Sequence, residues 1–226
     1  MHNFKDTFKE LVNKYRHGLY FLYALIYFPW FSIIEKHVTW HFHIVHMPLD
    51  DMIPFVEFFI IPYLFWFPYV AIPLVYFFLT DKETFLKSCR FLFTGMTLFL
   101  IISTIYPNGA YLRPIVFPRD NIFTTIVKIL YKMDTPTNLF PSIHVYNALG
   151  THLSICYSKK FKDFRPFKTG SLIIAVSIVL STMFIKQHSI FDVLTAIAMT
   201  LIFWFIFYLK KISLINIIQK RSKQSN

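Results

Sequence analysis

The chain has 226 residues, of which 55% are hydrophobic, 20% aromatic and 15% charged, and its mean hydropathy is +0.49. The charged share is well below the roughly 25% of a soluble domain, which argues against a soluble protein. The net charge of +11 would suit nucleic acid, but the basic residues are spread over short segments without an RNA- or DNA-binding motif. We therefore expect one integral-membrane domain, residues 1–226, and no nucleic-acid partner.

Apolar stretches predict the helices, because a helix needs about 20 mostly apolar residues to cross the hydrocarbon layer. Six stretches come near that length, which predicts an all-α membrane protein built as a six-transmembrane-helix bundle. The second stretch contains Pro62, Pro68 and Pro73, each of which removes a backbone donor, so a kink or a break is expected there. The stretches are Leu19–Ile34, Phe55–Leu79, Cys89–Ile105, Ser142–Tyr157, Ser171–Ile185 and Ile190–Leu209.

The distribution of lysine and arginine predicts the orientation, since cytoplasmic loops carry the excess of basic residues. Seventeen of the 23 basic residues fall before the first stretch, after the second, after the fourth and after the sixth. We therefore expect a multi-pass protein of the plasma membrane with both termini in the cytoplasm and a basic cytoplasmic tail at 210–226. Anionic lipids on the cytoplasmic side are the expected partners of these residues, and the N-terminal stretch is interpreted as a retained span.

The one long connection runs from Tyr106 to Phe140, and connections of that length are usually functional or disordered. Within it we predict a short helix, Ile122–Met133, whose apolar positions Ile122, Ile126, Ile129 and Leu130 fit an amphipathic segment lying in the membrane interface.

Two polar motifs follow, Pro141-Ser142-Ile143-His144 and His188-Ser189-Ile190-Phe191-Asp192. His188 and Asp192 are four apart at a predicted helix start, so they share one face. A carboxylate on one imidazole nitrogen leaves the other as a nucleophile, and attack on phosphorus is the natural use. The alternative is a structural polar pair between helices, although ionisable residues inside membranes are usually functional.

Pro141 and Ser142 are both favoured at a helix start, whose free N–H groups make an anion site. His144 lies in the first turn, where it could protonate a leaving oxygen and later activate water or an alcohol. A capped helix start with an interfacial histidine is the alternative. Arg113 is the best candidate for gripping phosphate oxygens, because its guanidinium offers parallel donors. A snorkelling arginine at the headgroup level is its alternative.

In these residues the chain resembles the type-2 phosphatidic acid phosphatase superfamily, which includes lipid phosphate phosphatases and sphingomyelin-synthase-like and inositol-phosphorylceramide-synthase-like phosphotransferases. The resemblance covers roughly residues 106–192. Three segments of the chain correspond in order to the family's three signatures: Tyr106 to Arg113-Pro114, Pro141 to His144, and Ser181-Thr182 to His188 and Asp192.

The resemblance implies that His188 is the nucleophile forming a phosphohistidine, His144 the general acid and base, and Asp192 the orienting carboxylate. It also implies that Arg113 and Ser142 bind phosphate, and that no metal or other cofactor is required. The chain departs from the family pattern at three positions. Tyr106 stands where the family has lysine, Ile143 replaces a glycine and Thr182 replaces an arginine.

Two nearby cations could compensate for the missing ones. Lys186 stands two residues before His188, and Arg119 follows Arg113 in the long connection. Lys186 could equally be an interfacial anchor. A phosphomonoester carries nearly two negative charges and a phosphodiester one, so a site with fewer cations would favour headgroup transfer over monoester hydrolysis.

Three functions remain open at this stage. The first is an outer-leaflet lipid phosphatase that hydrolyses a lipid phosphate or an isoprenoid pyrophosphate through a phosphohistidine. The second is a lipid headgroup phosphotransferase that uses the same histidine pair, and the third is a catalytically silent lipid-binding or transport protein. The lipid itself and the oligomeric state cannot be derived from the sequence.

The histidines between the first two spans, His37, His41, His43 and His46, make a metal site conceivable by spacing. Without cysteine or a known ligand signature, an interfacial or substrate-facing polar loop is the favoured interpretation. Cys89 and Cys156 are expected to be small buried residues rather than a redox pair.

Overall fold

The structure is a computed structural model that describes residues 10, 12–38 and 41–209. It is mostly helical, and five of its helical stretches are long and apolar enough to cross a membrane. This agrees with the mostly helical, membrane-type class expected from composition, while the expected sixth span, Ser142–Tyr157, is not among the five. The five stretches are Val12–His37, Glu57–Thr80, Lys82–Ile105, Arg165–Phe184 and Ile190–Leu209. The expected basic tail at 210–226 lies outside the described residues.

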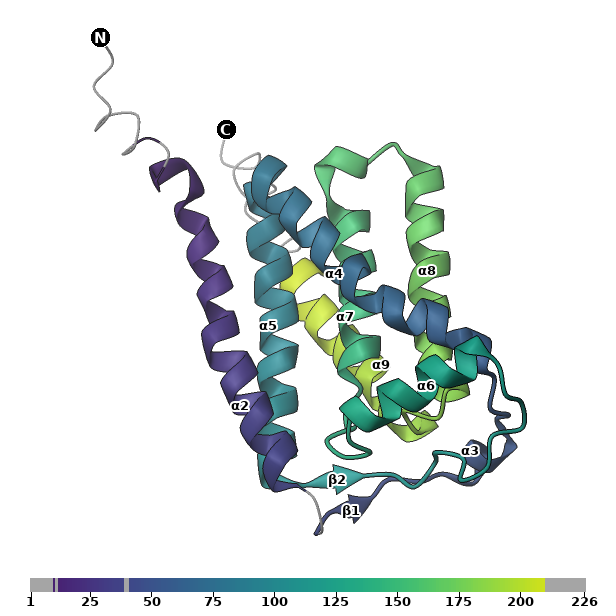
Figure 1. The fold of residues 1–226 in the computed structure, drawn as a ribbon. Coiled ribbons are helices and arrows are strands. Elements are labelled where there is room, and N and C mark those ends of the chain that lie inside the picture. Colours follow the sequence, from purple (N-terminus) through teal and green to yellow (C-terminus); the bar gives the residue numbers. More distant parts are fainter. Residues whose placement is uncertain (1–9, 11, 39–40, 210–226) are drawn as a thin grey trace.

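The elements follow one another in a simple order (Figure 1). The helices and strands are η1 (Arg16–Tyr23), α2 (Ala24–His37), β1 (His43–Ile44), α3 (Pro48–Met52), η2 (Glu57–Phe59), α4 (Ile60–Thr80), α5 (Lys82–Ile105), β2 (Asn108–Gly109), α6 (Ile122–Met133), α7 (Ile143–Tyr157), η3 (Lys159–Phe161), α8 (Arg165–Phe184), α9 (Ile190–Trp204) and the π-helical η4 (Phe205–Leu209).

Helix α7 lies at the centre of the bundle and is contacted by α4, α5, α8 and α9. Its 15 residues make it about 22 Å long, less than the roughly 30 Å of a hydrocarbon core. A Cβ on Gly95 of α5 would stand 2.0 Å from the ring of Tyr146 on α7, so only glycine permits this approach. The Tyr146 hydroxyl then donates to the carbonyl of Phe91 at 2.7 Å, which fixes α7 against α5.

The prolines of the second apolar stretch do not interrupt it. Helix α4 is continuous from Ile60 to Thr80 with Pro68 and Pro73 inside it, so of the expected kink or break the break does not occur. Prolines are tolerated inside membrane-type helices because neighbouring groups and small local adjustments satisfy the carbonyls that lose their donors. Helices α5 and α8 begin seven and six residues before the predicted starts, at Lys82 and Arg165, within polar sequence.

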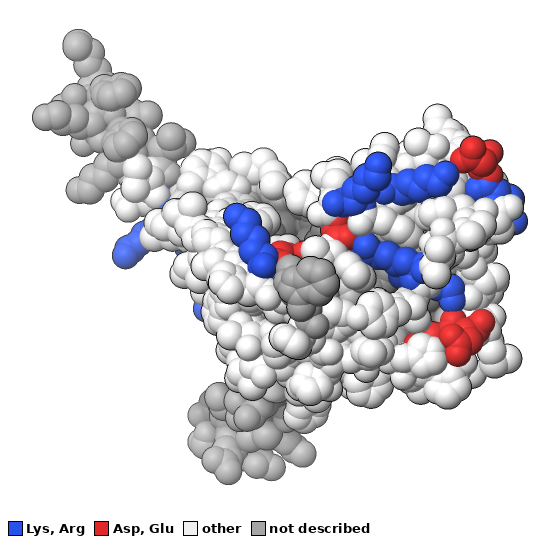
Figure 2. Space-filling view, turned by 60° about the horizontal axis from the view of Figure 1, so that its bottom comes forward, with Lys and Arg blue, Asp and Glu red and all other residues white. Residues whose placement is uncertain are grey.

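One end of the bundle carries the non-spanning elements. Strands β1 and β2 pair there in parallel, and α3 and α6 lie beside them across the ends of the long helices (Figure 1). Viewed from this end, lysines, arginines and acidic residues are interspersed on a largely uncharged surface (Figure 2). The described chain starts and finishes near the opposite end of the bundle (Figure 1).

Helix α6 has the predicted bounds, but its buried face differs from the predicted one. Its Val127 is fully buried in a cluster with Ile60, Tyr63 and Ile185, and Ile126 and Leu130 pack against that cluster. Ile122 and Ile129 are exposed instead. The helix therefore has apolar residues on two sides, one against the protein and one directed outward.

Candidate functional site

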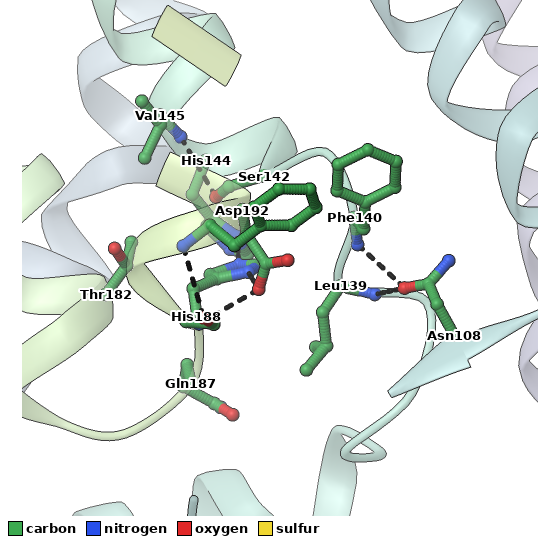
Figure 3. Close-up of polar contacts among 12 residues, drawn as sticks. Asn108, Leu139, Phe140, Ser142, His144, Val145, Thr182, Gln187, His188 and Asp192 are labelled. Carbon is green, nitrogen blue, oxygen red and sulfur yellow. Dashed lines mark hydrogen bonds and ion pairs between the residues drawn. The ribbon is translucent and has the colours of Figure 1, made fainter. Parts of the chain in front are cut away.

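The structure brings the two histidine motifs together at the end of the bundle that carries α6. His144 lies in the first turn of α7, and His188 lies in the turn between α8 and α9. The Nδ1 atom of His144 is 3.3 Å from Nε2 of His188, and Nδ1 of His188 is 3.4 Å from Oδ2 of Asp192 (Figure 3). The three side chains thus form a chain in which each nitrogen of His188 has one partner.

The turn that holds His188 is fixed by backbone contacts. The N–H groups of Gln187 and His188 both donate to the carbonyl of Thr182, at 2.9 and 3.0 Å. The Asp192 carboxylate accepts the Ser189 N–H at 2.9 Å, and the Ser189 hydroxyl accepts the Phe191 N–H. Two backbone N–H groups at the start of α9 are thus paired with side chains. Asp192 is completely buried and its Oδ1 has no hydrogen-bond partner among the described residues. The carboxylate is therefore held in place by the backbone and remains directed at His188.

Ser142 is a structural residue as well as a predicted phosphate ligand. Its hydroxyl accepts the Val145 N–H at 3.4 Å as the N-cap of α7, and its N–H donates to the Asp192 carbonyl at 3.3 Å. These contacts join the start of α7 to α9. The segment before it is held by Asn108, whose Oδ1 accepts the N–H groups of Leu139 and Phe140, each at 2.8 Å (Figure 3).

Two aromatic residues of α4 border His144. The centroids of Tyr63 and Trp66 lie 4.8 and 4.5 Å from the centroid of its imidazole. The indole Nε1 of Trp66 is buried and has no hydrogen-bond partner in the described part of the chain. The ring of His144 is consequently confined, and only its edge toward His188 meets a polar group among the contacts described.

Arg113 contacts Gln187, the residue next to His188, and most of its N–H donors are used within the protein. Its Nη1 donates to the carbonyls of Tyr131 and Asp134 at 3.1 and 2.9 Å, and its Nη2 donates to the Thr135 carbonyl at 3.1 Å and to Oε1 of Gln187 at 2.7 Å. Four of its five N–H donors are thereby used within the protein. In this conformation Arg113 joins the end of α6 to the residue next to His188.

A buried carboxyl lies in the same network. Asp134 accepts a hydrogen bond from Nε2 of Gln187 at 3.1 Å. Burial raises the pKa of Asp134 to about 6, and the positive charge of Arg113 opposes that rise. Burial likewise lowers the pKa of Arg113, with Asp134 acting in the opposite direction. The two residues balance each other's charge beside His188, so this network adds no net positive charge for an anion.

Lys186 and Asp50 form a second support of the histidine turn. The ammonium of Lys186 donates to the Asp50 carbonyl at 2.6 Å, and burial lowers the pKa of Lys186. The backbone of Lys186 has a φ of 56°, in the left-handed region. The Asp50 carboxylate accepts the Ser189 hydroxyl at 2.6 Å and the Ile190 N–H at 2.7 Å. Asp50 comes from α3 and is 2% exposed. The only signal for this contact in the sequence is an acidic residue in the polar loop.

Arg119 is not brought to the histidines. It forms a two-pronged ion pair with Glu57, at 2.6 and 2.7 Å, and Asn121 donates to the same carboxylate. Tyr106 and Thr182, two positions where the chain departs from the pattern it resembles, have other contacts. The ring of Tyr106 stacks on His43 at 4.2 Å, and Thr182 is buried with its hydroxyl bonded to the Val179 carbonyl. Neither position presents a cation.

The histidines of the β1 segment do not gather. Among residues 10, 12–38 and 41–209 no group of three or more histidine, cysteine or acidic side chains is arranged to hold a metal ion. His46 pairs with Asp51 at 3.0 Å at the surface. Within the same residues Cys89 and Cys156 are both free thiols.

Replacing Asp50 by alanine is expected to lower the free energy of unfolding by about 3 kcal/mol, because buried donors at the start of α9 lose a charged acceptor. Thermal unfolding in detergent measures this loss. Asp51→Ala is the matched control, since the neighbouring side chain is 73% exposed and surface ion pairs contribute little. Equal unfolding midpoints for the two variants would contradict the role assigned to Asp50.

The arrangement offers a nucleophile, a carboxylate that orients it and a second histidine that can carry a proton. Nδ1 of His144 and Nε2 of His188 face each other, so any ligand that reached Nε2 of His188 would have to separate the two imidazoles. In comparisons with protein-family models, curated proteins and solved structures, none matched this chain.

Proposed function

We propose that the protein is a membrane enzyme that transfers the phosphoryl group of a lipid phosphate ester through a phosphohistidine at His188. The observation that carries the proposal is the sequence of contacts from Asp192 through His188 to His144. The resemblance to the type-2 phosphatidic acid phosphatase superfamily supports the same assignment. Hydrolysis of a lipid phosphate or isoprenoid pyrophosphate is the first candidate reaction.

The proposed reaction has two steps. In the first, Nε2 of His188 attacks phosphorus, the bond from phosphorus to the lipid oxygen breaks, and protonated His144 gives its proton to that oxygen. Asp192 holds the proton on Nδ1 of His188, so the attacking lone pair is on Nε2. In the second step His144 takes a proton from water, the water oxygen bonds to phosphorus and the nitrogen–phosphorus bond breaks, which releases inorganic phosphate.

We place the site at the outer leaflet. The excess of basic residues lies in segments at the other end of the predicted spans, which favours a cytoplasmic location for that end. Helix α7 counts as a sixth crossing in this proposal. It is about 8 Å shorter than the hydrocarbon layer, so with its cytoplasmic end at the membrane surface its histidine end would be recessed. A recessed site would receive its substrate from the bilayer.

A headgroup phosphotransferase is the second candidate, and one observation favours it. Each of the three predicted cations already has protein partners: Arg113 on carbonyls, Arg119 on Glu57 and Lys186 on the Asp50 carbonyl. A phosphodiester carries one negative charge where a monoester carries nearly two, so it makes a smaller demand on these residues. In that reaction a lipid hydroxyl would replace water in the second step.

A substrate panel tests the proposal. The purified protein would be incubated in mixed micelles with phosphatidic acid, an isoprenoid pyrophosphate, and choline- or inositol-bearing phospholipids. Release of inorganic phosphate supports the hydrolase, and transfer of a labelled headgroup without phosphate release supports the transferase. If neither reaction occurs while lipid binding persists, the protein is a silent lipid-binding or transport protein and the enzyme proposal is wrong.

A further inference from the structure

A long groove lies between the N-terminal helix and α5, far along the bundle from the histidines. Its volume is about 860 Å³, and neither His144 nor His188 lines it. The groove is lined almost wholly by apolar surface, from residues of η1, α2 and α5 and from Phe203 of α9. Its apolar lining includes Leu22, Ile26, Phe93, Leu98, Ile101 and Phe203.

The length of the groove matches one leaflet. On α5 it extends from Cys89 to Ile101, and twelve residues of helix correspond to about 18 Å. Half of a roughly 30 Å hydrocarbon layer is about 15 Å. The groove is open at the molecular surface, and the side chains of Leu22 and Ile26 are more than half exposed. A single extended acyl chain from the adjoining leaflet would fit these dimensions.

A basic pocket continues the groove toward the start of α5. It has a volume of about 470 Å³ and is lined by three cations, Arg16, Lys82 and Arg90. Leu19, Tyr20 and Arg90 line both cavities, so the two adjoin. The Nε of Arg90 donates to the Tyr20 hydroxyl at 3.5 Å, which directs the guanidinium along the junction. No ion pair to a carboxylate is formed by these three cations within the described part of the chain.

A buried polar atom in the same pocket is unsatisfied. His17 lines the basic pocket and is 9% exposed, and its Nε2 bonds to the Phe78 carbonyl. Its Nδ1 has no hydrogen-bond partner among the described residues. Unpaired buried nitrogens are costly, so a ligand atom that could pair with it would stabilise the protein.

We propose that this combined cavity binds one anionic phospholipid, with its phosphate among Arg16, Lys82 and Arg90 and one acyl chain in the apolar groove. Charge complementarity favours an anionic over a zwitterionic headgroup, and the apolar groove favours a lipid over a free anion. The proposal does not depend on the reaction at the histidines. It places a structural lipid between the N-terminal helix and the bundle, where that helix contacts the rest of the protein mainly through α5.

Lipid binding by the full chain in detergent would test this site. Native mass spectrometry with added phosphatidylglycerol or phosphatidylcholine reports the bound lipid, and the thermal midpoint reports its stabilising effect. We expect phosphatidylglycerol to bind at least fivefold more tightly than phosphatidylcholine. Arg90→Gln should weaken phosphatidylglycerol binding about fivefold, since one basic residue near a membrane surface contributes about 1 kcal/mol. Thr94→Phe, which fills the groove, should weaken both lipids.

The matched control is Lys36→Gln, which removes the same charge from an exposed residue at the other end of α2. It should leave lipid binding unchanged. Equal binding of the two lipids, or equal losses in Arg90→Gln and Lys36→Gln, would overturn the proposal. Inorganic phosphate is the third ligand tested. If it stabilises the protein as much as phosphatidylglycerol does, the pocket is a site for free anions and the lipid assignment is wrong.

Discussion

His188→Ala is expected to abolish both the covalent intermediate and turnover. When the purified protein is mixed with a phosphorus-labelled lipid phosphate and quenched, an acid-labile phosphoryl adduct should form in the parent protein and be absent from the variant. Turnover should fall at least about a thousandfold, because loss of a nucleophile leaves only binding and positioning to accelerate the reaction. The His188 side chain is 5% exposed, and each of its ring nitrogens has one partner, so the imidazole is held in one orientation. Alanine removes this oriented group.

His144→Ala should have the opposite effect on the adduct. If His144 activates the water of the second step, its loss slows breakdown of the phosphohistidine by about 10²- to 10⁴-fold. The first step is slowed as well for a lipid alcohol, which needs a proton as it leaves. A nitrophenyl phosphate ester needs no such proton, so with this substrate the adduct should form and accumulate.

The control for both variants is His37→Ala, which removes an exposed histidine at the same end of the molecule. It should leave the adduct and turnover at the level of the parent protein. Continued turnover in His188→Ala, or turnover in the parent protein without any adduct on any substrate, would refute the phosphohistidine mechanism.

Some helix starts and the pairing of His188 with Asp192 were predictable from the sequence because their signals are local. Ser142 caps α7 and Ser189 caps α9, as serine before an apolar run predicts, and α6 has its predicted bounds. The i, i+4 spacing predicted that His188 and Asp192 lie side by side, and they do at 3.4 Å, although His188 lies in the turn before α9 and only Asp192 lies on the helix. The meeting of His144 with His188 followed only from placing both motifs at the same end of the bundle.

The surroundings of the pair were not predictable, because they depend on contacts between distant segments. Asp50 reaches the start of α9 across 139 residues, and Asn108 holds the segment before Ser142 across about 31. The residue types of such contacts are common in any loop. Helix α5 was predicted too short for a different reason: its first two turns are polar, and a hydropathy pattern starts only where the chain becomes apolar.

The cations were the weakest part of the prediction, for a physical reason. A guanidinium donates to neutral carbonyl oxygens as well as to phosphate oxygens, although the charged phosphate is the stronger partner. The sequence indicates that Arg113 is near the site but not which acceptors it meets. In the structure Arg113 donates to three backbone carbonyls and to the side-chain amide oxygen of Gln187. Its binding of phosphate stays a prediction.

Arg113→Lys separates these two roles. Lysine keeps the positive charge but has no planar fork, so it cannot reproduce four hydrogen bonds directed at separate acceptors or the contact with the Tyr131 ring, 4.5 Å away. If Arg113 mainly joins α6 to the histidine turn, the variant should lose about 3 kcal/mol of unfolding free energy. Turnover should fall with little change in KM, because Gln187, the residue next to His188, would no longer be held in place by Arg113.

If Arg113 instead binds phosphate in the working enzyme, the retained charge of lysine should preserve the unfolding midpoint while KM rises by about tenfold or more, the equivalent of one charged hydrogen bond. Lys132→Ala is the control for a general effect of positive charge at this end of the molecule, since it removes the cation of an exposed residue of α6. A raised KM with an unchanged midpoint would therefore refute the structural role, and a lowered midpoint with an unchanged KM would refute direct phosphate binding. The joining role is the expected result, because the four donors that phosphate would use are already satisfied within the protein.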